Sequence, residues 1–343
     1  MIKRGFNSDN IAPAAPEFIE AIIAANTGDA GSYGDDDWTA DLQDVARLAF
    51  DRDGDLTAFP VLNGKAANHL SLLAVTEPGG VVFCHEGAHI LVDEDDGPER
   101  YTDAQFVGIV DDGGGKIAPR ELRKAIMNSG PIENQSALSL TNATESGTVY
   151  SLDELAELIG IAHAANLLVH LDGARIANAA VHLNASLADL TWRAGFDIVS
   201  MGVTKNGGLS AEAVIAFTED IASEFIEQRA WTGHVPSKMR FLSSQLIVGM
   251  KGDGWRRRAA NANAMAALLA TGLRTIPGVE IVRRVDANLI FVSLPEPVRE
   301  RFDAAGYVCE VRPDLGPDVI RLLTNWSTSE ASVQNLLTVL SGS

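Results

Sequence analysis

Apolar residues follow two different spacings along most of the chain. Over residues 16–26 and 38–50 they recur three or four positions apart, which predicts two amphipathic helices. Short continuous apolar runs instead predict strands that are buried on both faces. These runs lie at 58–62, 81–84, 106–110, 137–140, 167–171, 198–203 and 213–217, with further helices predicted at 63–75, 119–127, 151–165 and 187–194. This alternation predicts an α/β fold with a mostly parallel sheet.

The pattern changes after residue 250. A long helix over 257–276 is followed by short predicted strands at 279–282, 289–292 and 320–323 and by a closing helix over 330–340. This order of elements predicts a small α+β domain. We therefore expect a large domain of residues 1–250 and a small C-terminal domain of residues 251–343, with the N-terminal segment of about residues 1–25 packing on the small domain.

Charge and composition exclude some classes of protein. The formal net charge of −19 would repel a phosphate backbone, so we expect no nucleic-acid partner. The acidic run from Asp93 to Asp96 is interpreted as a soluble surface. No apolar run reaches the roughly 18 residues of a membrane span.

The cysteines and the N-terminus bear on location. The two cysteines, Cys84 and Cys309, are too few for a disulfide framework or a zinc site, and reduced thiols are typical of the cytoplasm. Lys3 and Arg4 are followed by a stretch that is not uninterruptedly apolar, so we expect no signal peptide. We therefore predict a cytoplasmic protein without membrane association.

Two predicted strands end in residues that carry chemistry. The run 166–171 ends at Asp172, and the run 198–203 ends at Thr204 and Lys205. In an open α/β sheet, ligands bind at this carboxyl edge. A lysine and an acid at two such ends are what pyridoxal phosphate requires, since the lysine forms the Schiff base and the acid pairs with the protonated pyridine nitrogen. The alternatives are a surface lysine and an aspartate that caps the next helix.

A turn and a pair of histidines each have both a functional and a purely structural interpretation. Asn63, Gly64 and Lys65 open a helix after a strand, where backbone N–H groups can bind phosphate, although such turns are common. His85 and His89 have a spacing that could serve a metal, but no third ligand is near in sequence, so we expect no metal and assign one of them to face a planar cofactor ring.

An arginine stands inside the last predicted strand. Arg321 is flanked by apolar residues. It is either exposed on a half-buried strand, or its guanidinium group binds a substrate carboxylate with two parallel hydrogen bonds. Two residues near Asp172 have plainer interpretations. Arg175 could simply pair with Asp172, and His170 alternates with apolar residues as a packed histidine would.

The residues just described match the order of motifs in a known family. The chain resembles the threonine aldolases, which belong to the aspartate-aminotransferase-like (fold type I) pyridoxal-phosphate enzymes. The matching motifs are Ser8–Asn10, Tyr33–Asp36, Asn63–Asn68, Ala88–His89, His170–Arg175, Thr204–Gly207 and Arg321–Thr324, with 192–197 and 237–243 in support. The resemblance covers essentially the whole chain.

The resemblance implies a role for each matched position. Lys205 corresponds to the Schiff-base lysine, Asp172 to the pyridinium partner and Arg175 to the residue at the ring oxygen, with Thr204 beside the lysine. His89 corresponds to the stacked histidine. The turn of Asn63, Gly64 and Lys65 would hold phosphate, Ser8 and Arg321 would grip the substrate carboxylate, and Arg240 and Tyr33 would reach a neighbouring subunit's site.

Two departures affect the expected chemistry. The family's Thr-Gly-Thr phosphate turn is Asn63-Gly64-Lys65 here, and a histidine common after the fourth strand is absent, with Glu145 nearest in register. That histidine would lie near the substrate hydroxyl, so we expect weak discrimination at Cβ. As the base that removes the hydroxyl proton, His89 is preferred, with His85 and Glu145 as alternatives.

The resemblance implies cleavage of a β-hydroxy-α-amino acid to glycine and an aldehyde by a homodimer or homotetramer with shared sites. The alternatives are another fold type I lyase that eliminates at Cβ, and a non-catalytic pyridoxal-phosphate-binding protein. The reaction products distinguish the first alternative from an aldolase, because elimination gives pyruvate and ammonia instead of glycine and an aldehyde.

Overall fold

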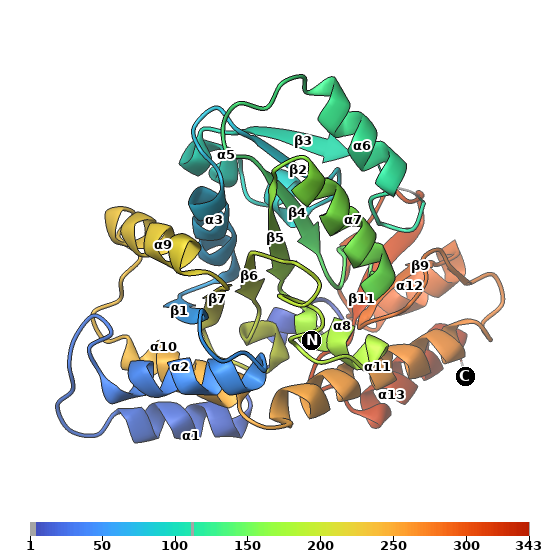
Figure 1. Ribbon diagram of the computed structural model, residues 1–343. Helices are drawn as coiled ribbons and strands as arrows, with labels where there is room; N and C mark the ends of the chain where they lie inside the picture. The colour runs from blue at the N-terminus through green and yellow to red at the C-terminus, as the bar shows by residue number, and fades with distance from the viewer. Residues whose placement is uncertain (1–4, 111–112, 343) are drawn as a thin grey trace.

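A seven-stranded sheet forms the centre of the molecule (Figure 1). The computed structural model describes residues 5–110 and 113–342, so Lys3 and Arg4 lie outside the described residues. In spatial order the strands are β1 (Thr57–Val61), β7 (Glu212–Ala216), β6 (Ile198–Met201), β5 (Leu168–Gly173), β4 (Ala137–Thr141), β2 (Val81–His85) and β3 (Gln105–Ile109). Only β7 runs against its neighbours. The predicted α/β fold with a mostly parallel sheet is therefore confirmed.

Helices cover both faces of this sheet (Figure 1). One face packs against α1 (Pro16–Ala25), α2 (Asp37–Ala49), α6 (Pro119–Asn128), α7 (Leu152–Ala164), α8 (Ile176–Leu183) and α10 (Arg240–Met250). The other face packs against α3 (Gly64–Val75) and α9 (Glu219–Trp231), with α4 (His89–Val92) and α5 (Gly97–Thr102) beside α3. Because both faces are covered, the strands are continuously apolar rather than alternating.

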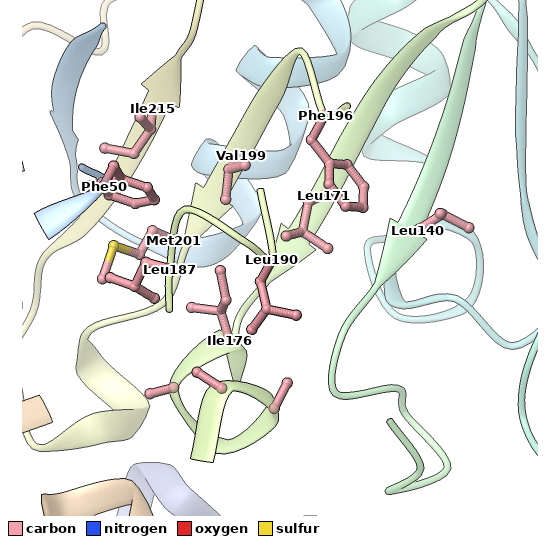
Figure 2. Close-up of a cluster of buried hydrophobic side chains, with 14 of the residues drawn as sticks. Phe50, Leu140, Leu171, Ile176, Leu187, Leu190, Phe196, Val199, Met201 and Ile215 are labelled. Carbon is pink, nitrogen blue, oxygen red and sulfur yellow. The ribbon is translucent and has the colours of Figure 1, made fainter. Parts of the chain in front are cut away.

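Successive residues of the central strands pack into cores on opposite faces of the sheet. Figure 2 shows side chains from β4, β5, β6 and β7 gathered over α8 and the segment that follows it, including Leu140, Leu171, Ile176, Val199 and Ile215. The neighbouring residues Ile198 and Val214 point to the opposite face and pack with Phe225 of α9. His170 is fully buried there, with Nδ1 2.9 Å from Ser139 Oγ and Nε2 2.9 Å from Ser200 Oγ, as expected for a packed histidine.

One predicted helix is wrong. Residues 187–194 form turns, and the helix between β5 and β6 is α8, which ends at Asn184 in a left-handed conformation. The Ser186 hydroxyl and the Asp189 carboxylate exchange hydrogen bonds with each other's backbone N–H groups. Such local bonds compete with a regular helix. The predicted capping box at Ser151 and Glu154 is present at α7.

A second, four-stranded sheet lies at the C-terminal end of the chain (Figure 1). Its antiparallel strands, in order, are β10 (Glu310–Val311), β11 (Val319–Leu323), β9 (Leu289–Ser293) and β8 (Glu280–Ile281), packed with α11 (Gly254–Leu273), α12 (Glu296–Ala304) and α13 (Glu330–Ser341). The predicted domain boundary at residues 250 and 251 falls between α10 and α11. That these are two domains stays a prediction.

The N-terminal segment is divided between the two sheets. Phe6 packs in the core of the small sheet, and its carbonyl accepts a hydrogen bond from Leu323 N at 2.9 Å. The 3₁₀ turn η1 (Asp9–Ile11) follows, and α1 then packs against α10 in the large core. The described start of the chain thus connects both sheets.

Candidate active site

A cavity of about 440 Å³ opens at the carboxyl edge of the large sheet. It is bordered by the ends of β4, β5 and β6 at Thr141, Asp172 and Met201, and by the start of α3. Lys205 lies in the same cavity. The structure therefore brings together the two strand ends that the sequence singled out, together with the helix start at 63–65.

The turn that carries Lys205 is held from several sides. It is a 3₁₀ turn, η2 (Thr204–Asn206), whose preceding backbone N–H at Val203 donates to the buried Glu212 carboxylate at 2.5 Å. Thr204 Oγ1 lies 3.3 Å from both the N and the O of Ala211. Burial, with Arg175 nearby, lowers the pKa of Lys205. The lysine is thus positioned and biased toward the neutral amine that forms an imine.

Close approach of the two strand ends requires a glycine. A Cβ added at Gly202, just after β6, would lie 2.3 Å from the Ala174 carbonyl oxygen. Since that oxygen belongs to backbone, it could not move aside cheaply. Gly202 therefore lets the turn with Lys205 come next to the turn after β5.

Asp172 is buried and has two protein partners. Its Oδ1 accepts a hydrogen bond from Ala174 N at 2.9 Å, and its Oδ2 accepts one from Asn68 Nδ2 at 2.9 Å. The alternative interpretation as a helix cap applies only to the local turn, because α8 begins after Arg175. Each carboxylate oxygen has a second lone pair, so these bonds leave capacity for a further donor.

Arg175 pairs with Asp9 rather than with Asp172. Its Nη2 lies 2.7 Å and its Nε 3.2 Å from Asp9 Oδ2, and Asn288 Nδ2 donates to Asp9 Oδ1 at 2.5 Å. Burial by itself would raise the pKa of Asp9, but Arg175 and Lys205 outweigh it and lower the pKa. The sequence did not mark Asp9 or Asn288 as site residues.

His89 borders the cavity and is bound on its far side by Glu94. His89 Nδ1 lies 2.6 Å from Glu94 Oε1, and the hydrogen bond to Glu94 raises the pKa of His89. Glu94 is only 2% exposed. The interpretation of the acidic run as a soluble surface is therefore wrong at this position, whereas Asp93, Asp95 and Asp96 are exposed.

Glu145 is in the cavity and His85 is not. Glu145 Oε1 accepts hydrogen bonds from His89 N and Thr141 Oγ1, both at 2.9 Å, and burial together with Asp172 raises the pKa of Glu145. His85 instead borders a small recess that shares Thr141 and Glu145 with the cavity, and its Nδ1 accepts a hydrogen bond from Gly87 N at 3.0 Å. The structure thus does not bring the alternative base His85 to the cavity.

The start of α3 faces the cavity as expected for a phosphate turn. Asn63 is its N-cap and accepts a hydrogen bond from Ala66 N at 2.9 Å, while Asn63, Gly64 and Lys65 all border the cavity. Lys65 Nζ lies 3.2 Å from the exposed Asp95. Helix starts of this kind favour an anion through backbone N–H groups and the helix dipole.

Arg321 and Ser8 do not border the cavity. Arg321 Nη2 forms an ion pair with Glu310 Oε2 at 2.5 Å, and its buried Nε has no hydrogen-bond partner among the described residues. Burial, with Arg175 nearby, lowers the pKa of Arg321. The Ser8 hydroxyl caps η1 by accepting a hydrogen bond from Asn10 N at 3.2 Å.

Tyr33 and Arg240 lie together outside the cavity. Tyr33 N donates to Ser237 O at 2.9 Å, and Arg240 Nη1 donates to Gly28 O at 3.1 Å. The Tyr33 side chain is 63% exposed. The loop before α2 and the start of α10 are therefore in contact, and neither Tyr33 nor Arg240 borders the cavity of its own chain.

The fold is that of the fold type I class: a threonine aldolase from Leishmania major superposes with a TM-score of 0.89, at 23% identity over 98% of both chains. A NifS-like protein superposes with a TM-score of 0.73 at 13% identity. The fold class predicted from the sequence is confirmed.

Sequence comparison defines the family within that class. Residues 5–297 match the family model of the beta-eliminating lyases, and the chain belongs to this family. It is 35% identical to a low specificity L-threonine aldolase of Pseudomonas sp., over 96% of this chain and 95% of the relative. The enzyme of the same description from Pseudomonas aeruginosa is 36% identical over the same shares. The predicted family is confirmed.

Within residues 5–110 and 113–342, no group of three or more histidine, cysteine, aspartate or glutamate side chains is arranged to hold a metal ion. None of the helices in that part of the chain combines the length and hydrophobicity of a membrane span.

Proposed function

We propose that this chain is a pyridoxal-phosphate-dependent aldolase that cleaves L-threonine, L-allo-threonine and related β-hydroxy-α-amino acids, such as phenylserine, to glycine and an aldehyde. The observation that carries the proposal is one cavity containing Lys205, Asp172 and His89, in a chain that is 35% identical to a threonine aldolase over 96% of its length. The donor set fits the cofactor, since it offers an amine, a carboxylate and a helix start in one place.

Each cavity residue has one task toward the cofactor. Lys205 would hold it covalently, Asp172 would keep its pyridine nitrogen protonated, and Arg175 would contact its ring oxygen. Asn63, Gly64, Lys65 and Thr204 would hold the phosphate. When bound, the cofactor supplies a ring that accepts the electron pair left on Cα as the Cα–Cβ bond breaks.

The protein moves the proton that starts the cleavage. His89 is the best-placed base, because it borders the cavity and its Nδ1 is occupied by Glu94, which leaves Nε2 to accept the hydroxyl proton. Glu145 is a weaker candidate, since its Oε1 already accepts two hydrogen bonds. Arg321, with its unpartnered Nε, and Ser8 would hold the substrate carboxylate.

Product analysis tests the proposed function. Purified protein with added pyridoxal phosphate is incubated with L-threonine, L-allo-threonine and phenylserine, and glycine, aldehyde, ammonia and 2-oxo acids are measured. Equal amounts of glycine and aldehyde are expected. Ammonia and a 2-oxo acid in place of glycine would identify an eliminating lyase, and the absence of any product would favour a non-catalytic binding protein.

Discrimination between the two Cβ epimers is expected to be weak. His89 and Glu145 both border the cavity, so the hydroxyl of either epimer finds a polar partner and neither is left unpaired. The expected difference is on the order of 1–2 kcal/mol, about five- to thirtyfold in kcat/KM. The measurement compares L-threonine with L-allo-threonine on one preparation. A ratio above roughly a thousandfold would contradict it and indicate one rigid hydroxyl partner.

We also propose that the active protein is a homodimer or homotetramer in the cytoplasm. The surface of Tyr33 and Arg240 lies outside its own chain's cavity, which suits residues that complete a neighbour's site. Cys84 and Cys309 are both free, as in a reducing compartment.

Hybrid sites test the shared-site proposal. Lys205→Ala and Arg240→Ala are expected to be inactive or strongly impaired alone, and mixing the two after subunit exchange should restore part of the activity, because one site in a hybrid then has both residues. Light scattering gives the oligomeric state, and mass spectrometry of differently labelled chains proves exchange. Proven exchange without restored activity would mean that each site is built from one chain.

A further inference from the structure

A buried polar cluster lies behind His89, outside the groups assigned above. It consists of Asn68 and His69 on α3 and Glu94 in the turn between α4 and α5. Glu94 Oε1 lies 2.6 Å from His89 Nδ1 and accepts a hydrogen bond from Asn68 Nδ2 at 2.9 Å. Glu94 Oε2 lies 2.7 Å from His69 Nε2. One carboxylate with a fully buried side chain is therefore held between two imidazoles and an amide.

The cluster is charged and closely packed. Burial alone would raise the pKa of Glu94, but contacts with His69, His89 and Asn68 lower it to about 2, so the carboxylate is ionised at working pH. The His69 ring lies 5.1 Å from the Tyr101 ring, and a Cβ at Gly97 would come within 2.5 Å of His69 Cε1. His69 is therefore packed directly on α5.

Asn68 connects this cluster to the cofactor's acid. Its Nδ2 donates to Glu94 Oε1 and to Asp172 Oδ2, both at 2.9 Å, while its buried Oδ1 has no hydrogen-bond partner among the described residues. A flipped amide would place its oxygen against two carboxylates. Both amide hydrogens are thus used to bridge the two acids, which fixes where each carboxylate lies.

An ionised carboxylate can only accept hydrogen bonds. The short contact to Glu94 therefore requires a hydrogen on His89 Nδ1, and in the neutral imidazole Nε2 is then the acceptor. A carboxylate that orients an imidazole in this way is a known device of acid–base catalysis, in which it selects the tautomer without itself taking the proton. Here that carboxylate is itself fixed by His69 and Asn68.

We propose that Glu94, held in place by His69 and Asn68, is a positioning residue for the aldol cleavage that fixes His89 as the Nδ1–H tautomer, so that Nε2 takes the substrate's hydroxyl proton. This inference rests on the proposed function for its catalytic consequence. The tautomer itself is a property of the protein alone and can be measured without substrate.

Substitution of Glu94 is expected to reduce turnover more than substrate binding. In Glu94→Gln one of the two oxygens becomes an NH₂ group, which cannot accept a hydrogen bond from Asn68 or His89, and His89 loses the charge that fixes its tautomer. Because a positioned base contributes about 10²–10⁴-fold, kcat should fall on the order of 10²-fold while KM changes little. Glu94→Asp keeps the charge and should recover part of the loss.

The pH profile gives a second readout. Glu94 raises the pKa of His89, so the acidic limb of kcat/KM, where His89 must lose its proton, should move to lower pH in Glu94→Gln. The substitution leaves unchanged the other groups that face the cluster. These are Asp172 on β5, Lys205 in η2, Glu145 after β4, Tyr101 on α5 and His234 after α9.

NMR of the cofactor-free protein tests the tautomer directly. The protein is labelled with ¹⁵N-histidine, and the His89 signals are assigned by comparison with His89→Asn. In the wild type these signals should report a hydrogen on Nδ1 and none on Nε2. In Glu94→Gln they should report a lower pKa of His89 or a mixture of tautomers. His69→Phe should cause a partial change, and His69→Gln, which keeps a donor, a smaller one. Asp96→Asn is the matched control, because it removes an exposed acid from the same run in a left-handed position that asparagine tolerates.

The outcomes separate this inference from the proposed function. An inactive wild type would overturn the proposed function, and the NMR result would still decide the role of Glu94. An active wild type whose Glu94→Gln variant keeps kcat, pH profile and tautomer would overturn the positioning role. Cofactor absorbance and circular dichroism check folding, and if Glu94→Gln fails to fold, Glu94→Asp and His69→Phe decide the question by the same readouts.

Discussion

Replacing Lys205 with alanine should abolish turnover while leaving the cavity able to bind the cofactor. The covalent link holds the cofactor in the reacting geometry, so its loss is expected to lower kcat by more than about 10³-fold. The start of α3 and Asp172 do not depend on Lys205, because Asn63 and Asn68 hold them. Cofactor should therefore still bind, without a covalent bond.

Chemical trapping identifies the lysine. Borohydride added to the wild-type holoenzyme should fix the cofactor's mass on the peptide that contains Lys205, and Lys205→Ala should show no such peptide. Lys65 is the matched control, since it borders the same cavity. Lys65→Ala should bind cofactor more weakly but retain the mass on Lys205. A trapped cofactor on Lys65 or elsewhere would contradict the assignment.

The sequence predicted those parts of the site that local patterns encode. Asp172 and Lys205 each follow an apolar run, and the direction of parallel strands brings such ends to one edge of the sheet. The start of α3 at Asn63 could be recognised because asparagine is a good N-cap. All three lie in the cavity. Their functional roles remain predictions that the experiments above test.

The partners that hold these residues could not be predicted in the same way. Asp9 and Arg175 are 166 positions apart, and Asp9 and Asn288 are 279 apart, so no local pattern connects them. Glu94 stands in a run of four acids, three of which are exposed, and nothing in the run itself marks which one turns inward. Only the packing of α3, α4 and α5 makes it the partner of two histidines.

Several helices beside the large sheet were not predicted, and two of them show the reason. The sequence pattern indicated neither α9 nor α10, although both are regular helices. Helix α9 buries only Ile221, Ala222, Phe225 and Arg229, and α10 is buried over most of its length, so neither shows a simple apolar stripe. Tertiary packing, more than local periodicity, stabilises such helices.

Arg321→Ala should nearly eliminate the use of amino acids without loss of cofactor. Arg321 is 23% exposed in its side chain, its Nη2 is bound to Glu310, and its buried Nε is unpartnered among the described residues. Two charge-assisted hydrogen bonds to a substrate carboxylate contribute about 3–6 kcal/mol together, so kcat/KM for L-threonine should fall by roughly 10²–10⁴-fold. Cofactor absorbance should be unchanged, because Arg321 pairs with Glu310 and with none of the residues proposed to hold the cofactor.

The control variants for Arg321 separate charge from geometry. Arg321→Lys should recover little, since an ammonium keeps the charge but lacks the planar fork that meets a carboxylate with two parallel bonds. Arg312→Ala removes a nearby arginine that pairs with Asp314, and it should leave kcat/KM within about twofold because surface ion pairs contribute little. The affinity for glycine, titrated spectroscopically, isolates carboxylate binding from bond cleavage. If Arg321→Ala binds glycine as tightly as the wild type, the substrate carboxylate is held elsewhere, and Ser8 becomes the first residue to substitute.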